Sequence, residues 1–489
     1  MGYDTRYDVI VCGGGTSGFA AAIASARGGA KTLLIEKTGV LGGQMSLSGP
    51  PGFAYARLFN MKGERDVAGI VKETYDRLLA QGHALPEWRS EIRSKAGYTF
   101  SYIDPDWWVM LAFEMCEEEG VELLLDTLVV GVEKDGDTVT GVIVENANGR
   151  NTINGQIVID CTGEGYVSMQ AGAETECVDR ETVQPHTLAF TVDGVDWDKL
   201  LWYIRTNPEQ FSFKQLIFPY EDANTREEVL DYYRKCYKIT DLGELMGFYE
   251  LRDMALKNGD WHPYSGAGFF LTPKEGGHIQ AHFQHSSQVD HALPTDAWDL
   301  TRCNIECRKQ NKIAWTFFKN YVPGFENAYI TRTCTELRLR EGPRIVGEYI
   351  LTRDDVEEAR QFEDTIGKSS FKAGGYHVAG MDTLSVVAGK EQKHNDLAFP
   401  KDGKSYDIPY RCLLPKKVDN LLAAGKCVST DRPAYLRYLH QTMVTGQAAG
   451  AAAALSVKKG KTPRELKEDI RELQQILMDQ GAILFETKI

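Results

Sequence analysis

The sequence predicts an α/β protein built around a Rossmann-like parallel sheet, and three observations lead to this fold class. A short β-branched run at residues 7–12 is followed directly by a glycine-rich loop and an apolar helix. A second apolar run, residues 32–36, ends in a carboxylate. Two more buried strands are expected at residues 157–165 and 420–425, far apart along the chain. Apolar runs of this length, bounded by glycine, are typical of parallel strands buried on both faces.

The first loop carries the spacing that binds a diphosphate. Gly13, Gly15 and Gly18 form a Gly-x-Gly-x-x-Gly motif between the first strand and a helix over 19–26. The first glycine permits a tight turn, the second lets a pyrophosphate approach the backbone, and the third lets helix and strand pack closely. The helix N-terminus supplies free N–H groups for the phosphates. The loop therefore predicts a dinucleotide site.

The second strand ends in the acidic residue that such a site needs. Glu36 lies 18 residues after Gly18, where a carboxylate accepts hydrogen bonds from an adenosine ribose. A glycine-rich turn without a ligand would leave this carboxylate unexplained. The glycine-rich stretch 39–46 then replaces the helix that a nicotinamide domain has at this point, which favours a loop along the pyrophosphate and ribityl chain of FAD.

Composition narrows the partners. The chain is 43% apolar and 25% charged, as in folded globular proteins, and its net charge of −14 argues against nucleic acid and anionic membranes. No run approaches the ~20 apolar residues of a membrane span, and the N-terminus has no signal peptide pattern, so we expect a cytoplasmic location. None of the ten cysteines forms Cys-x-x-Cys, which argues against zinc ribbons and redox pairs. A homo-oligomer remains possible.

Several motifs in fixed order resemble one family. They comprise the glycine motif, Glu36-Lys37, and residues 41–46, 160–165, 337–351, 408–415, 420–429 and 446–450. Together they are similar to the broad FAD-dependent oxidoreductase family with a glutathione-reductase-type FAD-binding domain. The resemblance implies FAD as cofactor and an inserted, mixed α+β substrate domain. Two departures are Cys161, where relatives usually have alanine, and the Arg-Glu-Gly-Pro-Arg sequence at 340–344.

The resemblance also implies which residues hold FAD. The glycine loop would hold the pyrophosphate, Glu36 the ribose, the second loop the centre of the cofactor, Val129 the adenine, and the C-terminal residues the ribityl chain and flavin. The implied cofactor residues are Gly13, Gly15, Thr16, Ser17, Gly18, Glu36, Lys37, Gly42, Gly43, Gln44, Met45, Val129, Thr162, Gly163, Gly425, Thr442 and Met443.

The order of the motifs predicts an interrupted FAD-binding domain made of residues 1–54, 105–175 and 405–460. A helical and irregular excursion is expected at 55–104, a substrate domain at 176–404, and a C-terminal helix at 461–489. A helix over 67–79, a capped helix beginning at Asp104-Pro105, and a turn at 135–137 are further expectations.

Candidate catalytic residues follow from position. Arg437, Tyr438 and His440 precede the expected flavin-contacting helix and offer an anion anchor, a hydroxyl and a group that titrates near neutrality. A capped surface loop is the alternative. His377 lies in a glycine-rich segment that is plausible as a mobile wall. Arg340 belongs to a charged run, where a substrate anchor and a structural ion network are equally open.

The segment that contains His278, His282 and His285 alternates as in a strand, with 278 and 282 on one face. Sheet histidines explain it better than a metal site, so no metal is expected. A second glycine motif for NADPH is absent from the sequence. We therefore expect a flavoenzyme that transfers a hydride between FAD and a small organic substrate, at a hydroxyl, a carbonyl or an activated C=C, with a separate electron acceptor or donor. The alternatives are a flavin monooxygenase and a non-catalytic flavin-binding subunit of a complex.

Overall fold

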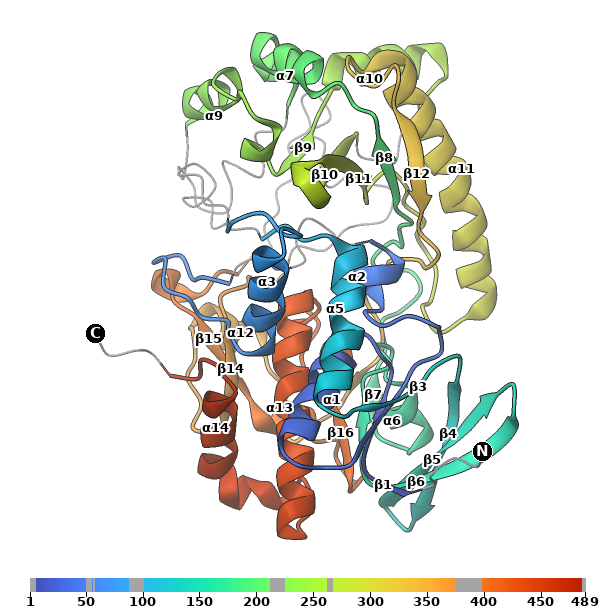
Figure 1. Ribbon diagram of the computed structural model, residues 1–489, viewed down its shortest axis with the longest axis vertical. Coiled ribbons are helices and arrows are strands. Elements are labelled where there is room, and N and C mark those ends of the chain that lie inside the picture. The colour runs from blue at the N-terminus through green and yellow to red at the C-terminus, as the bar shows by residue number, and fades with distance from the viewer. Residues whose placement is uncertain are drawn as a thin grey trace.

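The computed structural model describes residues 6–49, 55, 58–87, 101–211, 225–261, 267–374 and 398–485. Two large sheets organise this part of the chain. One is a mixed sheet whose strands come from the N-terminal and C-terminal parts of the sequence. The other is an antiparallel sheet whose strands come from the middle of the chain, and it is drawn in the upper part of Figure 1. The α/β class with a parallel sheet, predicted from the sequence, is confirmed.

The first sheet has a parallel part and an antiparallel extension. The parallel strands run in the order β3-β2-β1-β6, and β16 adds to the carboxyl-terminal half of β6. The antiparallel strands β5 and β4 follow the other half of β6, with the predicted turn between them. The strands are β1 (Arg6–Cys12), β2 (Thr32–Ile35), β3 (Glu122–Leu124), β4 (Leu128–Asp135), β5 (Thr138–Asn146), β6 (Gly149–Asp160) and β16 (Leu421–Ala423).

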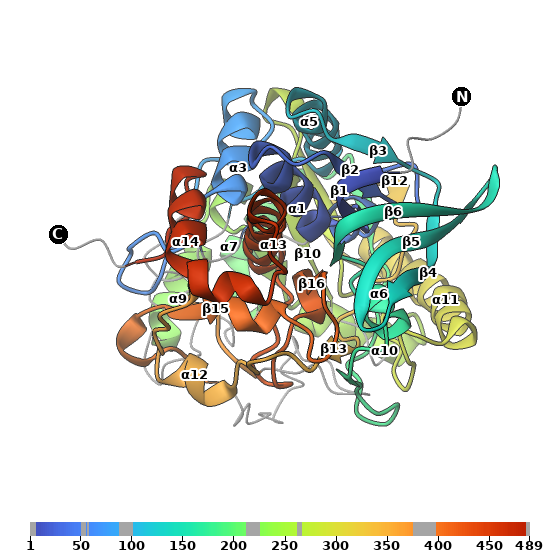
Figure 2. The same ribbon diagram turned by 90° about the horizontal axis from the view of Figure 1, so that it is seen from below.

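Helices α1 (Thr16–Arg27) and α13 (Leu439–Lys459) pack against each other beside this sheet, at the centre of Figure 2. Glycine makes the contact possible. A Cβ atom placed on Gly446 would lie 2.1 Å from the carbonyl oxygen of Ser17, and one on Gly450 would lie 2.0 Å from that of Ala21. The two ends of the sequence are therefore joined through a backbone-to-backbone contact that any larger side chain would force apart.

The antiparallel sheet has the order β12-β8-β11-β10-β9. An aromatic core fills the space between this sheet and its helices. Phe283 stacks on Phe190 at 4.6 Å between ring centroids and meets Phe318 of α11 edge-on at 4.6 Å. The elements are β8 (Phe190–Asp193), β9 (Glu244–Met246), β10 (Gly268–Pro273), β11 (Ile279–Phe283), β12 (Tyr329–Thr333), α7 (Trp197–Thr206), α9 (Arg226–Arg234), α10 (Tyr249–Asn258) and α11 (Ala297–Tyr321).

Smaller elements complete the described chain. Two antiparallel pairs join distant segments, β13 with β7 and β14 with β15. The remaining elements are α2 (Gln44–Leu47), α5 (Pro105–Glu118), α6 (Tyr166–Gln170), β7 (Thr175–Glu176), β13 (Arg344–Ile345), α12 (Arg353–Glu357), β14 (Thr365–Ser369), β15 (Tyr406–Pro409) and seven 3₁₀ turns, among them η6 (Gly425–Cys427) and η7 (Glu465–Asp469).

Two predicted helices begin later than expected. The helix expected over 67–79 is α3 (Ile70–Ala80), because Gly69 has a φ of 67°, outside the helical region. In the tail, the Glu465 carboxylate accepts from the Thr462 N–H at 2.8 Å. A 3₁₀ turn follows, however, and α14 starts only at residue 470 (Ile470–Asp479). The Asp104 cap of α5 is confirmed, with its side chain accepting from the Asp106 N–H at 3.0 Å.

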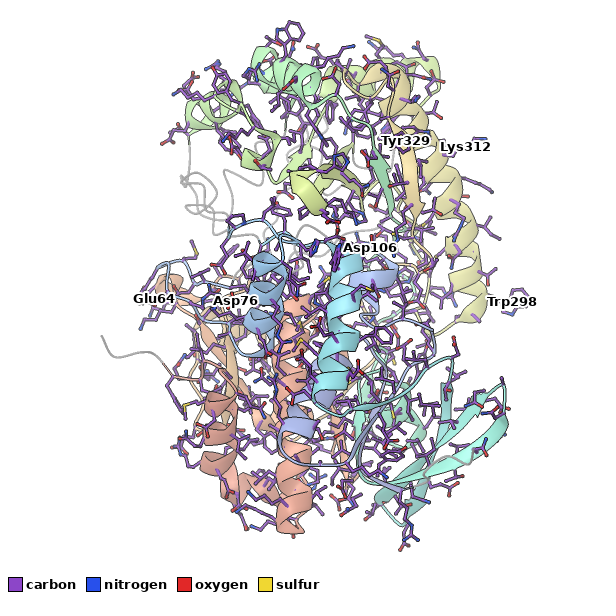
Figure 3. All side chains as sticks on the ribbon, in the orientation of Figure 1. Glu64, Asp76, Asp106, Trp298, Lys312 and Tyr329 are labelled. Carbon is purple, nitrogen blue, oxygen red and sulfur yellow. The ribbon has the colours of Figure 1, made fainter. Side chains whose placement is uncertain are left out.

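Charged side chains join the antiparallel sheet to the start of α5. Lys274, from the end of β10, contacts Asp104 at 2.7 Å and Asp106 at 2.6 Å, and Arg332 of β12 contacts Asp106 at 3.1 Å. Figure 3 labels Asp106 at this junction. No helix in the described ranges is both long and apolar enough to cross a membrane.

Candidate functional site

The glycine loop between β1 and α1 is open on one side and closed on the other. Gly13 has a φ of 102°, and its N–H donates to the Ile35 carbonyl at 2.7 Å. A Cβ atom on Gly18 would lie 1.8 Å from the Gly13 carbonyl oxygen, so this glycine closes the turn against the strand. A Cβ atom on Gly15 would meet nothing within 4 Å. The loop therefore leaves free space where its second glycine precedes the helix N-terminus at Thr16 and Ser17.

Glu36 forms hydrogen bonds to the first glycine loop, to the start of the second loop and to the segment before β4. Its carboxylate accepts from the Gly14 N–H at 2.7 Å and from the Thr38 N–H at 2.9 Å, and the side chain is only 5% exposed. Its carbonyl accepts from the Thr127 N–H at 3.0 Å, which brings the start of β4, and so Val129, to the end of β2. The adjacent Lys37 points elsewhere, because its exposed ammonium pairs with Glu336 at 2.9 Å.

The second glycine loop runs alongside the first. The Gly42 N–H donates to the Gly14 carbonyl at 2.8 Å, and Gly43 has a φ of 52°, a left-handed value that favours glycine. Gln44 reaches across to the segment after β12, with its amide donating to the Leu337 carbonyl at 3.0 Å. Met45 is fully buried beneath the loop. Gly43 and Gln44 keep partly exposed surface, whereas Met45 offers none.

Residues from the other end of the chain close the same loop. Gly425, with a φ of 86°, donates its N–H to the Thr445 hydroxyl at 3.0 Å. The hydroxyls of Thr442 and Thr16 lie 2.8 Å apart, which joins the first turn of α13 to the first turn of α1. Met443 is fully buried. At the end of β6 the Thr162 hydroxyl donates to the Asp160 carboxylate at 2.7 Å. Gly163 follows with a φ of 85°.

The predicted cofactor residues are thus gathered around two adjoining glycine loops. Those with partly exposed surface are Gly13, Gly15, Gly43, Gln44, Val129, Thr162 and Gly163. Buried members of the set pack behind them, and the Lys37 ammonium is directed to Glu336. Three glycines without a Cβ atom, free space beside Gly15 and a helix N-terminus form an arrangement suited to a diphosphate.

The candidate catalytic residues differ in accessibility. Arg437 and Tyr438 are half-buried, and the Arg437 guanidinium lies 5.5 Å from the centre of the Tyr438 ring. Phe371 packs on that ring with 3.6 Å between centroids. His440 is 0% exposed, and its ring centroid lies 6.3 Å from that of Tyr438. A side chain without accessible surface touches a ligand only if its surroundings move. His377 lies outside the described residues.

The charged run around Arg340 divides into two parts. Neither a substrate anchor nor a structural ion network therefore describes all of its residues. Glu341 pairs with Arg432 at 2.8 Å, and Arg344 pairs with Glu176 at 3.3 Å, which is a structural ion network. Arg338 and Arg340, in contrast, form no ion pair with a carboxylate in the described part of the chain. Their partners are neutral groups: Gln284 for Arg338, and the Pro185 carbonyl and His285 for Arg340.

Two neighbours of these arginines, Gln284 and His285, were absent from the predicted site residues. They follow β11, and the histidine alternation does mark that strand: His278 contacts Asp193 at 2.8 Å and His282 contacts Thr191 at 3.1 Å. Nothing in the sequence indicates, however, that the end of this strand lies against Arg340. Among the described residues, no group of three His, Cys, Asp or Glu side chains is arranged to hold a metal ion.

Comparison with known proteins defines the class. The model of the FAD dependent oxidoreductase family matches residues 8–477. Digeranylgeranylglycerophospholipid reductase 1 from Methanococcoides burtonii is 26% identical over 200 residues, which are 40% of this chain and 47% of that protein. The match thus spans less than half the length of that relative.

Two solved structures match this chain over most of its length, at low sequence identity. A geranylgeranyl bacteriochlorophyll reductase-like protein from Thermoplasma acidophilum has a TM-score of 0.43 at 12% identity, covering 97% of this chain and 87% of its own. The p-nitrophenol 4-monooxygenase from Pseudomonas putida DLL-E4 has a TM-score of 0.44 at 12% identity, covering 99% and 90%.

This chain belongs to the FAD-dependent oxidoreductase family, as its sequence motifs predict. It is an enzyme, and its cofactor is FAD. The described residues are compatible with that cofactor, because the free space beside Gly15 and the helix N-terminus at Thr16 suit a diphosphate.

Proposed function

We propose that FAD binds along the two glycine loops in a glutathione-reductase-type domain, and that the enzyme transfers a hydride between a small organic substrate and the flavin. The open approach at Gly15, set against the closed contact at Gly18, carries the proposal. The proposed FAD-binding domain comprises residues 1–54, 105–175 and 405–460, and residues 176–404 form the substrate domain. FAD supplies the hydride chemistry, and the protein supplies orientation and proton transfer.

The proposed cofactor contacts follow the surfaces described above. Gly13, Gly15 and the first N–H groups of α1 hold the diphosphate. Glu36 lies where the ribose is expected, but its carboxylate already accepts from Gly14 and Thr38, so a ribose hydroxyl would use its remaining lone pairs. Gly43 and Gln44 line the central part of the cofactor. Thr442 shapes the turn at the start of α13.

The substrate side is proposed to involve Arg437 and Tyr438. Both are half-buried and lie just before α13. The Phe371 ring packs against the Tyr438 ring at an interplanar angle of 33°, which restricts the movement of the phenol. We assign proton exchange with the substrate to Tyr438, since a hydroxyl serves as general acid or base when it is fixed within hydrogen-bond reach. His440, the expected proton carrier, is fully buried and is better described as a positioning residue behind Tyr438.

The substrate reaction is a redox change at a hydroxyl, a carbonyl or an activated C=C. The relative from Methanococcoides burtonii is named as a reductase, which supports the direction of reduction. A reductase of this kind needs a separate electron donor, and an oxidase or dehydrogenase a separate acceptor, because the sequence offers one dinucleotide motif. The small molecule and this redox partner are the proposed partners.

An anaerobic screen tests the proposal. Oxidised enzyme is mixed with hydroxy acids, sugars, steroids and polyphenols, reduced enzyme with enones and ketones, and flavin absorbance is followed. We expect one class to reduce or reoxidise the flavin, and Tyr438→Phe to slow that step about 10²–10⁴-fold with FAD content unchanged. Hydroxylated product that requires O₂ would instead establish a monooxygenase. A stoichiometric protein partner without any flavin response would establish a non-catalytic subunit.

A further inference from the structure

Five polar side chains from three segments converge beside the proposed flavin loop. Arg338 and Arg340 lie between β12 and β13, Gln284 and His285 follow β11, and Arg437 precedes α13. We call these five residues the arginine cluster. Hydrogen bonds fix its place: Gln44 of the second glycine loop donates to the Leu337 carbonyl at 3.0 Å, and Lys426 donates to the Leu339 carbonyl at 3.3 Å. The run that carries Arg338 and Arg340 is thus held between the second glycine loop and η6.

Among the described residues, no carboxylate pairs with the positive charges of this cluster. Within the described residues, Arg338, Arg340 and Arg437 form no ion pair, although ion pairs are abundant elsewhere in this acidic protein. Burial, together with the positive charge of Arg437, lowers the pKa of Arg338 to about 10. Burial and the neighbouring arginines lower the pKa of His285 as well. Both effects indicate that the cations of the cluster are buried close to one another.

Hydrogen-bond donors also outnumber acceptors. Arg340 Nη2 lies 3.2 Å from His285 Nδ1, and Gln284 Nε2 lies 3.1 Å from His285 Nε2. A neutral imidazole has one acceptor nitrogen, so one of these contacts sets a donor against a donor. Turning the Gln284 amide over relieves that contact, but it then directs the amide NH₂ at Arg338, which now donates to Gln284 Oε1. In either orientation one donor lacks an acceptor among the contacts of the described residues.

A second observation lies next to the cluster. His282 is 1% exposed, and its Nε2 has no hydrogen-bond partner among the described residues. A Cβ atom on Gly49, just after the second glycine loop, would lie 2.3 Å from His282 Cε1, so the imidazole directly borders that loop. An unmet buried nitrogen is costly, and it indicates a missing polar partner at this point.

We propose that the arginine cluster binds a carboxylate of the substrate and thereby holds the reacting carbon beside the flavin. A carboxylate supplies the negative charge and the acceptor atoms that the cluster lacks, and two guanidinium groups match its planar, bidentate geometry. A purely structural cluster would carry its own carboxylates, as Glu341 does for Arg432. The inference rests on the proposed function only in placing the flavin beside the cluster. It adds that the substrate is an organic acid.

Equilibrium binding to the oxidised holoenzyme tests this without turnover. Benzoate, its neutral analogue benzamide and inorganic phosphate are titrated by calorimetry and by the change in flavin absorbance. We expect saturable binding of benzoate and none of benzamide. Arg338→Gln and Arg437→Gln should each weaken benzoate at least about tenfold, since a charged hydrogen bond is lost. Arg302→Gln is the matched control, because this half-exposed arginine of α11 lies outside the cluster, and it should leave binding unchanged.

Each other outcome overturns the inference. Equal binding of benzamide would show that charge is not recognised, and binding of phosphate but not benzoate would exclude a carboxylate site. Arg437→Lys replaces Arg437→Gln if that variant fails to fold, because it keeps the charge and removes the planar, bidentate guanidinium. An unchanged benzoate affinity in every folded variant of the cluster would also overturn the inference. The proposed hydride transfer fails separately: it is refuted if benzoate binds as expected while no compound changes the redox state of the flavin.

Discussion

Gly15→Ala separates folding from cofactor binding. Gly15 has φ −64° and ψ −178°, an extended conformation that alanine adopts without strain, and its added methyl group meets no atom within 4 Å. Replacing glycine by alanine at such a position removes freedom from the unfolded chain. We therefore expect the flavin-free variant to be as stable as the parent, or more stable by about 0.4–1 kcal/mol.

The same methyl group occupies the space through which the diphosphate is proposed to approach the backbone. An overpacked contact of this kind costs about 1–3 kcal/mol. That penalty raises the dissociation constant of FAD about 5- to 150-fold. The two effects have opposite signs, because the methyl group is tolerated by the protein and not by the ligand.

Flavin-free protein is prepared for both measurements: urea denaturation gives the free energy of unfolding, and quenching of flavin fluorescence gives the FAD affinity. Gly18→Ala is the control, because its methyl group would lie 1.8 Å from the Gly13 carbonyl oxygen and should destabilise the flavin-free protein itself. An unchanged FAD affinity in Gly15→Ala, with unchanged flavin-free stability, would refute the placement of the diphosphate at Gly15.

Two further predictions concern stability. Lys368 and Asp407 form a buried ion pair at 2.7 Å. Lys368→Met leaves the carboxylate unpaired and should lower the free energy of unfolding by about 3–5 kcal/mol, and adding Asp407→Asn should restore part of that loss. Losses that simply add in urea denaturation would contradict this. Burial lowers the pKa of His186 to about 4, against 6.5 when unfolded, so the unfolded chain binds the extra proton and stability falls as pH decreases from about 6.5 to 4. His186→Gln should reduce this slope by up to about 1.4 kcal/mol per pH unit, and parallel pH profiles would contradict it.

Local signals accounted for the parts of the fold that are determined by neighbouring residues. The strand, glycine turn and helix around Gly13 and Gly18 depend on contacts within one supersecondary unit, as does the cap of α5 at Asp104. The predicted start of α3 was three residues too early, because Gly69 has a positive φ that lies outside the helical region. Gly69 lies against the side chain of Gln447: a Cβ atom there would lie 2.3 Å from the Gln447 amide oxygen. That contact joins residues almost 400 positions apart.

The roles within the arginine run were not predictable for the same reason. Arg338, Arg340, Glu341 and Arg344 follow one another closely, but their partners come from the segment after β11, from the loop before α13 and from β7. Sequence spacing cannot state which of these segments carries a carboxylate. The division into paired and unpaired arginines is therefore a property of tertiary contacts, and it is this division that distinguishes an ion network from a ligand site.

A net charge of −14 and an anion site are compatible, because the two act over different distances. Exposed carboxylates more than about 8 Å away are largely screened at physiological ionic strength, whereas charges inside the protein are screened much less. The diphosphate of FAD is proposed to be held by backbone N–H groups and a helix N-terminus, which add no formal charge. Arg338, Arg340 and Arg437 are then free of that task. Because they form no ion pair within the described chain, their positive charge is available to the proposed substrate carboxylate. The acidic surface therefore prevents neither the binding of the diphosphate nor that of the carboxylate.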